Sequence, residues 1–80
     1  MNIVVKLFGA ESRSVGAPSV TVNIDGADCT ALRAALERDV PALRPFLANA
    51  RFAVNHEFAA PEQQLRETDE IALIGMVSGG

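Results

Sequence analysis

The alternation of hydrophobic and polar positions predicts two strands at the start of the chain. Residues 2–8 (NIVVKLF) are rich in β-branched side chains, and residues 19–24 (SVTVNI) alternate strictly, so the second strand is expected to run antiparallel to the first. Between them, residues 9–18 contain two glycines, a proline and two serines, which favour a long loop. Long loops often carry function, and Arg13 is the only cation of this one.

A helical pattern follows the turn residues Asp25 and Gly26. Apolar side chains recur at helical spacing from Leu32 to Val40, which predicts one main helix with an apolar face packed on the sheet. Asp28 stands just before this pattern and is predicted to be the N-cap. Because proline disfavours helical geometry in the preceding residue, Pro41 is expected to end the helix at Val40.

The region after the main helix is predicted to be short and irregular. Residues 41–48 (PALRPFLA) contain two prolines and suggest a helical turn rather than a long helix. Residues 51–55 (RFAVN) form a predicted strand, and Asn55 and His56 can make the turn that leads to the next two residues. The helical turn is expected to be anchored by Leu43, Phe46 and Leu47, and the strand is expected to place Phe52 and Val54 on one face.

The last third of the chain is a polar segment followed by a strongly apolar strand. Residues 59–68 are polar apart from Leu65, which is expected to fill the core from a loop. Residues 71–74 (IALI) are continuously apolar, which suggests a central strand with both faces covered, next to the first strand. The order strand, strand, helix, strand, strand predicts an α+β domain over residues 1–74, with one main helix on one face of a mixed sheet of four to five strands.

Composition excludes several classes of function. Eighty residues allow one core, and 49% hydrophobic with 21% charged residues is typical of a globular domain. A net charge of −3 without any basic run argues against a nucleic-acid partner. No stretch is long and apolar enough to span a membrane, and a cytoplasmic location is expected. The single Cys29 fits a reducing compartment and is predicted to be a buried apolar residue.

The chain offers few groups for chemistry of its own. His56 is the only histidine and is expected at the surface of a turn, without a second ligand for a metal. The acidic residues Glu67, Asp69 and Glu70 have no partner base and are expected to be solvated. The chain ends in Gly79 and Gly80, and this terminus is either a frayed end or a reactive α-carboxylate on a narrow, flexible tail over residues 75–80.

Taken together, these motifs resemble the ubiquitin-like β-grasp sulfur carriers, and most closely the small subunit of molybdopterin synthase. The resemblance covers nearly all 80 residues. It includes Leu7-Phe8-Gly9-Ala10, Arg13, Asp28 with Leu32 and Leu36, Ala53-Val54-Asn55, the six residues 69–74 (DEIALI), and Val77-Ser78-Gly79-Gly80.

This resemblance implies a specific chemistry at the end of the chain. An E1-like enzyme that uses ATP and Mg²⁺ would adenylate Gly80, and a sulfur donor, a sulfurtransferase, would supply the sulfur for a thiocarboxylate. Gly79, Ser78 and Val77 would pass into the large subunit of molybdopterin synthase, where the sulfur is donated to a pterin precursor. The chain itself would bind no cofactor and would be the sulfur-donating subunit of a two-subunit synthase.

The resemblance also implies an apolar partner surface that includes Phe58 and Ile74, with Phe8 nearby and Arg13 in the preceding loop. Phe58 can equally be read as a core residue. Family members often carry an aromatic residue where Gly9 stands, and two prolines where Gly75 and Met76 stand. The second departure predicts a more flexible base of the tail, with a greater ordering cost on binding.

Three other functions are consistent with the sequence. The chain can be a sulfur carrier for thiazole or cysteine synthesis or for thiolation of transfer RNA, although the long segment 9–18 favours the molybdopterin type. It can be a ubiquitin-like modifier that is conjugated to lysines through Gly80. It can also be an interaction module whose tail is inert, in which case deletion of Gly79 and Gly80 leaves function unchanged.

Overall fold

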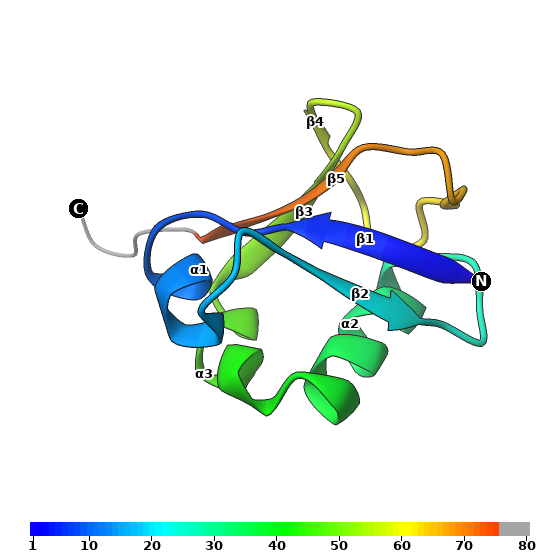
Figure 1. The fold of residues 1–80 in the computed structure, drawn as a ribbon. Coiled ribbons are helices and arrows are strands. Elements are labelled where there is room, and N and C mark those ends of the chain that lie inside the picture. Colours follow the sequence, from blue (N-terminus) through cyan, green and yellow to red (C-terminus); the bar gives the residue numbers. More distant parts are fainter. Residues whose placement is uncertain (76–80) are drawn as a thin grey trace.

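The computed structural model describes residues 1–75, which form a five-stranded mixed sheet with helices on one side (Figure 1). The strands occur in the spatial order β2-β1-β5-β3-β4. The predicted α+β class and mixed sheet are confirmed. The elements are β1 (Asn2–Lys6), α1 (Gly9–Val15), β2 (Ser19–Asn23), α2 (Cys29–Asp39), the 3-10 helix η1 (Pro41–Leu43), α3 (Arg44–Leu47), β3 (Ala50–Val54), β4 (Glu57–Phe58) and β5 (Ile71–Gly75).

The first and last strands lie side by side in the middle of the sheet. β1 pairs with β2 in antiparallel register, with Ile3 opposite Val22, and with β5 in parallel register, with Val5 opposite Ile71. β5 pairs on its other side with β3 in antiparallel register. Both predictions about β1, its antiparallel pairing and its place next to the last strand, are therefore confirmed.

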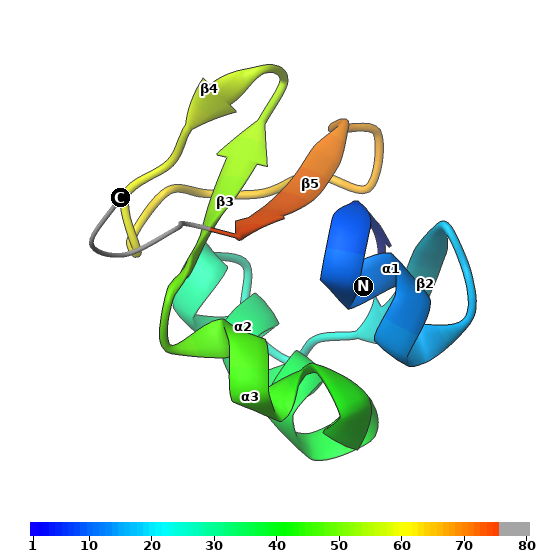
Figure 2. The same cartoon turned by 90° about the vertical axis from the view of Figure 1, so that its left-hand side faces the viewer.

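One face of the sheet is covered by helices and the other is open (Figures 1 and 2). Along β5, Ile71 and Leu73 are buried against the helices, whereas Ala72 and Ile74 are only half-buried on the open face. The prediction that both faces of the last strand are covered is thus wrong for the open face, because no helix within residues 1–75 packs there. β5 also extends to Gly75, one residue beyond the predicted strand.

The main helix begins and ends where the sequence predicts. Asp28 is the N-cap, and its Oδ1 accepts a hydrogen bond of 2.9 Å from the backbone N–H of Ala31. The helix ends at Asp39, and Val40 leaves the helical region with ψ of 75° before Pro41. The buried residues of α2 are Cys29, Leu32, Ala35 and Leu36. Burial raises the pKa of the Cys29 thiol, and the nearby Asp28 carboxylate adds to this effect.

The predicted core residues outside the main helix are also confirmed. Leu43 and Leu47 are fully buried beneath the sheet, and Phe46 is half-buried against them. Leu65 is buried from the loop before β5, where its N–H donates to Ala27 O at 2.7 Å. This backbone contact fixes the loop, so that a single leucine can fill the space between helix and sheet.

The predicted loop over residues 9–18 is instead mostly helical, and that prediction is wrong. Helix α1 begins at Gly9, whose φ is +53°, and ends at Gly16, whose φ is +80°. The N–H of Gly16 donates to Ser12 O at 2.8 Å, and Ser12 Oγ donates to Ala17 O at 3.0 Å. The two glycines therefore mark the ends of a short helix, because only glycine adopts a positive φ without strain.

Arg33 joins three elements on the helix side and carries a first prediction. Its guanidinium donates to Leu47 O at the end of α3 and to Ala50 O at the start of β3, the latter at 3.0 Å. Replacing Arg33 with methionine keeps the apolar stem but removes both bonds. The free energy of unfolding, measured in urea, is expected to fall by about 2–3 kcal/mol, because hydrogen bonds from a charged group are the stronger ones.

A matched control for this variant is Arg44→Met, since Arg44 also donates to a helix carbonyl, Glu37 O, but at the exposed surface. This change is expected to lower the free energy of unfolding by less than about 1 kcal/mol. Equal effects of the two substitutions would contradict the role assigned to Arg33.

The turn between β3 and β4 is tied to the start of β5. Asn55 and His56 have φ of 51° and 73°, which is the geometry of a tight two-residue hairpin, so the predicted turn is confirmed. The Asn55 amide donates to Asp69 Oδ1 at 3.1 Å, and its carbonyl oxygen accepts from the N–H of Glu70 at 2.9 Å. The other oxygen of Asp69 accepts from the N–H of Arg66 at 2.8 Å.

The Asp69 contacts predict an acid-dependent loss of stability. The Arg66 N–H, and after it the Asn55 amide, lower the pKa of Asp69 below its ordinary value. This stabilisation is fully present above the unfolded pKa of about 3.9 and is lost as the pH falls through the lowered folded pKa. Thermal unfolding is measured from about pH 7 to pH 3. The melting temperature of the wild type should exceed that of Asp69→Asn most at neutral pH, and the difference should become smaller below about pH 4. A gap that is independent of pH would contradict this assignment.

Candidate functional site

The open face of the sheet contains an apolar groove that is built by the strand register. Lys6, Ala72, Ala53 and Phe58 lie directly opposite one another across β1, β5, β3 and β4. The two central positions of this row are alanines, and the larger Lys6 and Phe58 side chains stand at its two ends. The row is therefore hollow in the middle. The resulting cavity has a volume of about 370 Å³.

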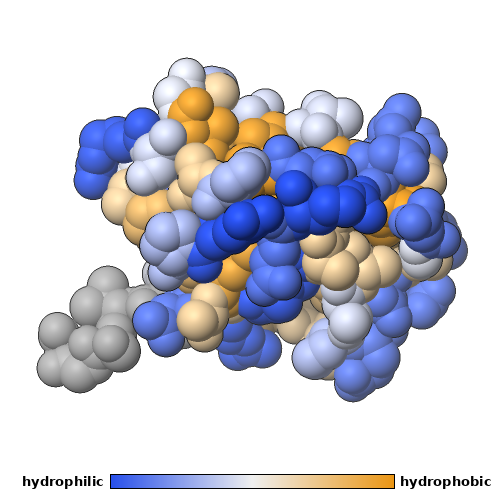
Figure 3. Space-filling view, turned by 90° about the horizontal axis from the view of Figure 1, so that it is seen from below, coloured by the Kyte–Doolittle hydropathy of each residue, from blue (hydrophilic) through white to orange (hydrophobic). Residues whose placement is uncertain are grey.

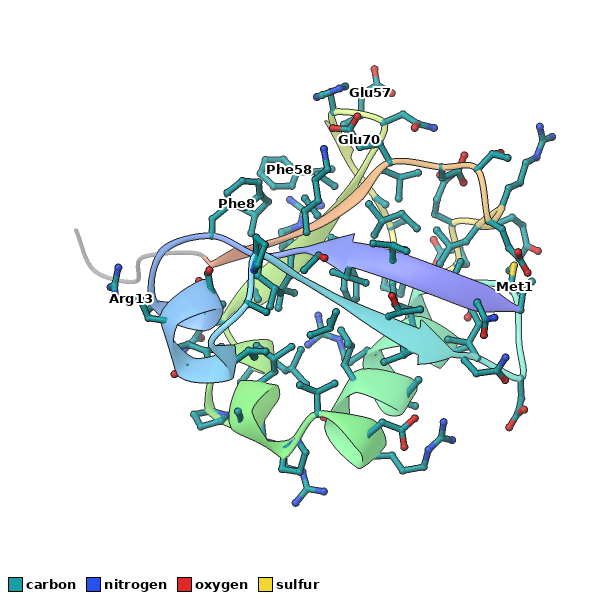
Figure 4. All side chains as sticks on the ribbon, in the orientation of Figure 1. Met1, Phe8, Arg13, Glu57, Phe58 and Glu70 are labelled. Atoms are coloured by element: carbon teal, nitrogen blue, oxygen red, sulfur yellow. The ribbon has the colours of Figure 1, made fainter. Side chains whose placement is uncertain are left out.

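Large apolar side chains form the walls of this groove. Phe8 follows β1, Ile74 lies on β5, and Phe58 lies on β4, and all three line the cavity. Phe8 and Phe58 are each 53% exposed, and Figure 4 shows both side chains on the side of the sheet away from the helices. Aromatic side chains left half in water at a concave surface are typical of a protein interface. We call this surface, lined by Phe8, Phe58, Ile74, Ala53 and Ala72, the open-face groove.

Charged residues form one rim of the open-face groove. Glu70 Oε2 lies 3.3 Å from Lys6 Nζ and 3.4 Å from His56 Nε2. The Arg51 guanidinium lies 4.7 Å from the centre of the Phe58 ring. Because these groups are exposed, their contacts contribute little to stability. Lys6, His56 and Glu70 instead place polar groups along one side of an apolar floor, as at the polar rim of a binding surface.

The structure brings together some of the predicted site residues. Phe8, Phe58 and Ile74 meet in the open-face groove, and the exposure of Phe58 excludes the alternative that it is a core residue. Arg13 is exposed on α1 and is not among the residues that line the groove (Figure 4). The four predicted tail residues, Val77, Ser78, Gly79 and Gly80, lie outside the described residues.

Sequence reasoning did not identify the floor and rim of the groove. Ala53 and Ala72 are inconspicuous in a sequence, and Lys6, His56 and Glu70 read as ordinary surface residues. Their shared position depends on the pairing of β1 with β5 and of β5 with β3. The only signal available was period-two alternation, which places Lys6 and Phe8 on one face of the first strand.

A second cavity, of about 190 Å³, lies at the start of α2, where the N–H groups of the first helical turn are already hydrogen-bonded. Helix N-termini bind anions through free N–H groups. Here the N–H of Cys29 donates to Gln63 O, that of Thr30 to Pro61 O, and that of Ala31 to Asp28. Since the first-turn donors are occupied by the protein, the N-terminus of α2 has no free N–H group at Cys29, Thr30 or Ala31 to offer an anion.

Figure 3 shows the surface of the molecule from below, on the helix side. A band of hydrophilic residues crosses it, with hydrophobic residues scattered on either side (Figure 3). Between residues 1 and 75, no helix has the length and apolarity that a membrane span requires. The exposed large aromatic residues, Phe8 and Phe58, both belong to the open-face groove.

Comparisons with known proteins agree with this architecture. The model of the ThiS family matches residues 5–80, which is nearly the whole chain. The chain belongs to the ThiS family. The predicted membership among the ubiquitin-like β-grasp sulfur carriers is thereby confirmed. No curated protein sequence matches the chain.

Solved structures show the same family fold over full-length chains. SAMP1 from Haloferax volcanii, the small archaeal modifier protein 1, is 29% identical, with all of both chains covered and a TM-score of 0.81. A chain of the complex of subunits 1 and 2 of the molybdopterin-converting factor from Helicobacter pylori is 26% identical over all of both chains, with a TM-score of 0.70. SAMP1 from Methanosarcina acetivorans, 21% identical over 99% of this chain and 96% of its own, has a TM-score of 0.76 and supports the fold alone.

Proposed function

We propose that this ThiS-family chain is the sulfur carrier subunit of a molybdopterin synthase. The observation that carries the proposal is the open-face groove, whose exposed Phe8 and Phe58 lie on the same face as Ile74 of β5, the strand that leads toward Gly79 and Gly80. A docking surface beside the C-terminal strand is what a carrier needs if its partners bind the folded domain and act on its C-terminal carboxylate. The likeness to a chain of the Helicobacter pylori complex supports the same reading.

The proposed chemistry takes place at the terminal carboxylate of Gly80. One carboxylate oxygen attacks the α-phosphate of ATP, held with Mg²⁺ by an E1-like enzyme, and pyrophosphate leaves. The terminal sulfur of a sulfurtransferase persulfide then attacks the acyl adenylate, AMP leaves, and an acyl disulfide forms. A second thiol attacks the sulfurtransferase sulfur of this disulfide, which releases the thiocarboxylate and leaves a disulfide between the two thiols. The carrier contributes no catalytic side chain to these steps, since its role is to bind and to present the carboxylate.

The open-face groove is proposed to bind two partners in turn. The activating enzyme and the large synthase subunit would each insert an apolar side chain between Phe8 and Phe58, above the alanine floor. Burying aromatic residues in a desolvated centre supplies most of the affinity of such interfaces. Because both partners use the same face, the thiocarboxylated carrier must dissociate from the activating enzyme before it binds the large synthase subunit.

Reconstitution tests this proposal. The chain is first incubated with an E1-like activating enzyme, ATP, Mg²⁺ and a sulfur donor, and is then added to the large subunit of molybdopterin synthase with a pterin precursor. The proposal predicts a sulfur-containing pterin product, with the carrier returned to an ordinary carboxylate. A thiocarboxylated carrier that forms no complex with the large subunit would instead indicate thiazole, cysteine or transfer-RNA pathways.

A second candidate is protein modification through Gly80. The observation in its favour is the similarity to SAMP1 from Haloferax volcanii, which is 29% identical over all of both chains. In this case the acyl adenylate reacts with a lysine amine and forms an amide bond. Conjugates on blots that disappear when Gly80 is removed would support this function, whereas a discrete complex without conjugates would favour the carrier.

A further inference from the structure

Glu11 has an unusual environment for a charged residue. Within residues 1–75 it is the only buried polar or charged residue, with 9% of its surface exposed. It comes from α1, which lies at the end of the sheet where β5 ends (Figure 1). Its carboxylate lies against Gly75, the last residue of β5, although the two residues are at opposite ends of the chain. Buried carboxylates are costly, so a residue of this kind calls for an explanation.

The Glu11 carboxylate occupies the space where a side chain at position 75 would lie. A Cβ placed on Gly75 would overlap Oε1 of Glu11 and would stand 3.2 Å from its Cδ. The backbone of Gly75 is not in the positive-φ region, unlike that of Gly9 and Gly16. A side chain at Gly75 would therefore have to displace the Glu11 carboxylate, whereas the backbone of Gly75 imposes no strain. At Gly9 and Gly16 the situation is reversed, because space is open there and φ is positive.

We propose that Glu11 is a positioning residue for the reactive end of the chain. Its carboxylate occupies the space of the absent side chain and holds the backbone of Gly75, to which residues 76–80 are attached. A fixed attachment point reduces the number of conformations available to the Gly80 carboxylate, so less entropy is lost when the activating enzyme binds it. This inference rests on the proposed function, since it assumes that Gly80 is presented to an enzyme.

The test compares Glu11→Ala with Glu11→Gln and with Ser14→Ala, an exposed change on the same helix. Amide order parameters at Gly75 and Met76 are measured by NMR relaxation, and kcat and KM are measured for adenylation by an E1-like enzyme. Glu11→Ala should lower both order parameters and raise KM about fivefold to thirtyfold, the factor for fixing one more residue, with kcat unchanged. Glu11→Gln and Ser14→Ala should behave like wild type, because the first keeps the shape and the second lies outside the contact.

A double-mutant cycle isolates the contact from general damage to α1. Gly75→Ala alone should displace the Glu11 carboxylate and lower stability, whereas in the Glu11→Ala background the same change should be tolerated because the Cβ then has room. Each variant changes the unfolding equilibrium constant by a measurable factor. The factor for the double variant should differ at least about threefold from the product of the two single-variant factors. Strictly additive effects would overturn the proposal, as would unchanged order parameters in Glu11→Ala.

The two hypotheses fail in different ways. If Glu11→Ala loosens Gly75 but wild-type Gly80 is never adenylated, the positioning contact stands and the carrier function is wrong. If Gly80 is adenylated and Glu11→Ala changes neither the order at Gly75 nor KM, the carrier function stands and the positioning role is wrong. A Glu11→Gln variant that matches Glu11→Ala would also overturn it, because the effect would then come from charge and not from packing.

Discussion

Replacing Phe58 with alanine is expected to weaken the complex with the large subunit of molybdopterin synthase by about 30-fold, or roughly 2 kcal/mol. The ring stands at the wall of the open-face groove with 53% of its surface in water, and it would become buried in the complex. Phe8→Ala should have an effect of similar size, since Phe8 is equally exposed and lines the same groove. Binding is measured by titration calorimetry with purified large subunit.

The matched control is Val4→Ala. Val4 lies on the same strand and the same open face as Lys6, and it is 52% exposed, but it is opposite Thr21 on β2 and does not line the groove. Its removal should change affinity by less than about threefold, as expected for a residue outside the buried centre. Comparable losses from Val4→Ala and Phe58→Ala would contradict the groove as the docking surface.

Folding is not expected to account for the effect of Phe58→Ala. The ring lies over the Arg51 guanidinium at 4.7 Å, and an exposed cation–π contact contributes about 0.5–1 kcal/mol. The core cluster does not include Phe8 or Phe58. Urea unfolding of both variants should therefore remain within about 1 kcal/mol of wild type, which separates a loss of binding from a loss of structure.

Deletion of Gly80 is expected to abolish sulfur donation while leaving the fold intact. The core cluster lies within residues 3–73, so the free energy of unfolding should not change. A chain shortened by one residue retracts its terminal carboxylate by about 3.3–3.6 Å. Since a misplacement of about 1 Å can reduce a reaction 100-fold, pterin product should fall below about 1% of the wild-type rate even if Gly79 is adenylated. The measurement is product formation in the reconstituted synthase.

The control for this deletion is a chain extended by one alanine after Gly80. It keeps Gly79 and Gly80 but places the carboxylate on the wrong residue, so it should be equally inactive and equally stable. Full activity of either variant would contradict the role of Gly80 and would favour an interaction module with an inert tail.

The sequence was sufficient for the elements whose burial follows a simple period. The strict alternation of residues 19–24 predicted β2, and the helical spacing after Asp28 predicted α2 together with both of its ends. Leu65 stood out as a single apolar residue in a polar segment and is indeed buried. In each case the pattern reflects one element that packs one face on the core. It can be read without knowing which distant residues the element contacts.

The sequence was not sufficient where distant residues decide the structure. Helix α1 was missed because glycines were interpreted as loop residues, although Gly16 after Val15 is a C-terminal helix signal. The contact of Glu11 with Gly75 links the two ends of the chain and has no local signature. The alanine floor of the groove likewise depends on strand register, so Phe58 could not be assigned to core or interface beforehand.

The most direct test of the central claim is intact-mass measurement of the protein isolated from its native host. The account predicts a population in which one terminal oxygen is replaced by sulfur, with fragmentation placing the change at Gly80. Incubation with the activating enzyme, ATP and a sulfur source should increase this population, and deletion of Gly80 should remove it. An ordinary carboxylate at Gly80 under all of these conditions would contradict the account.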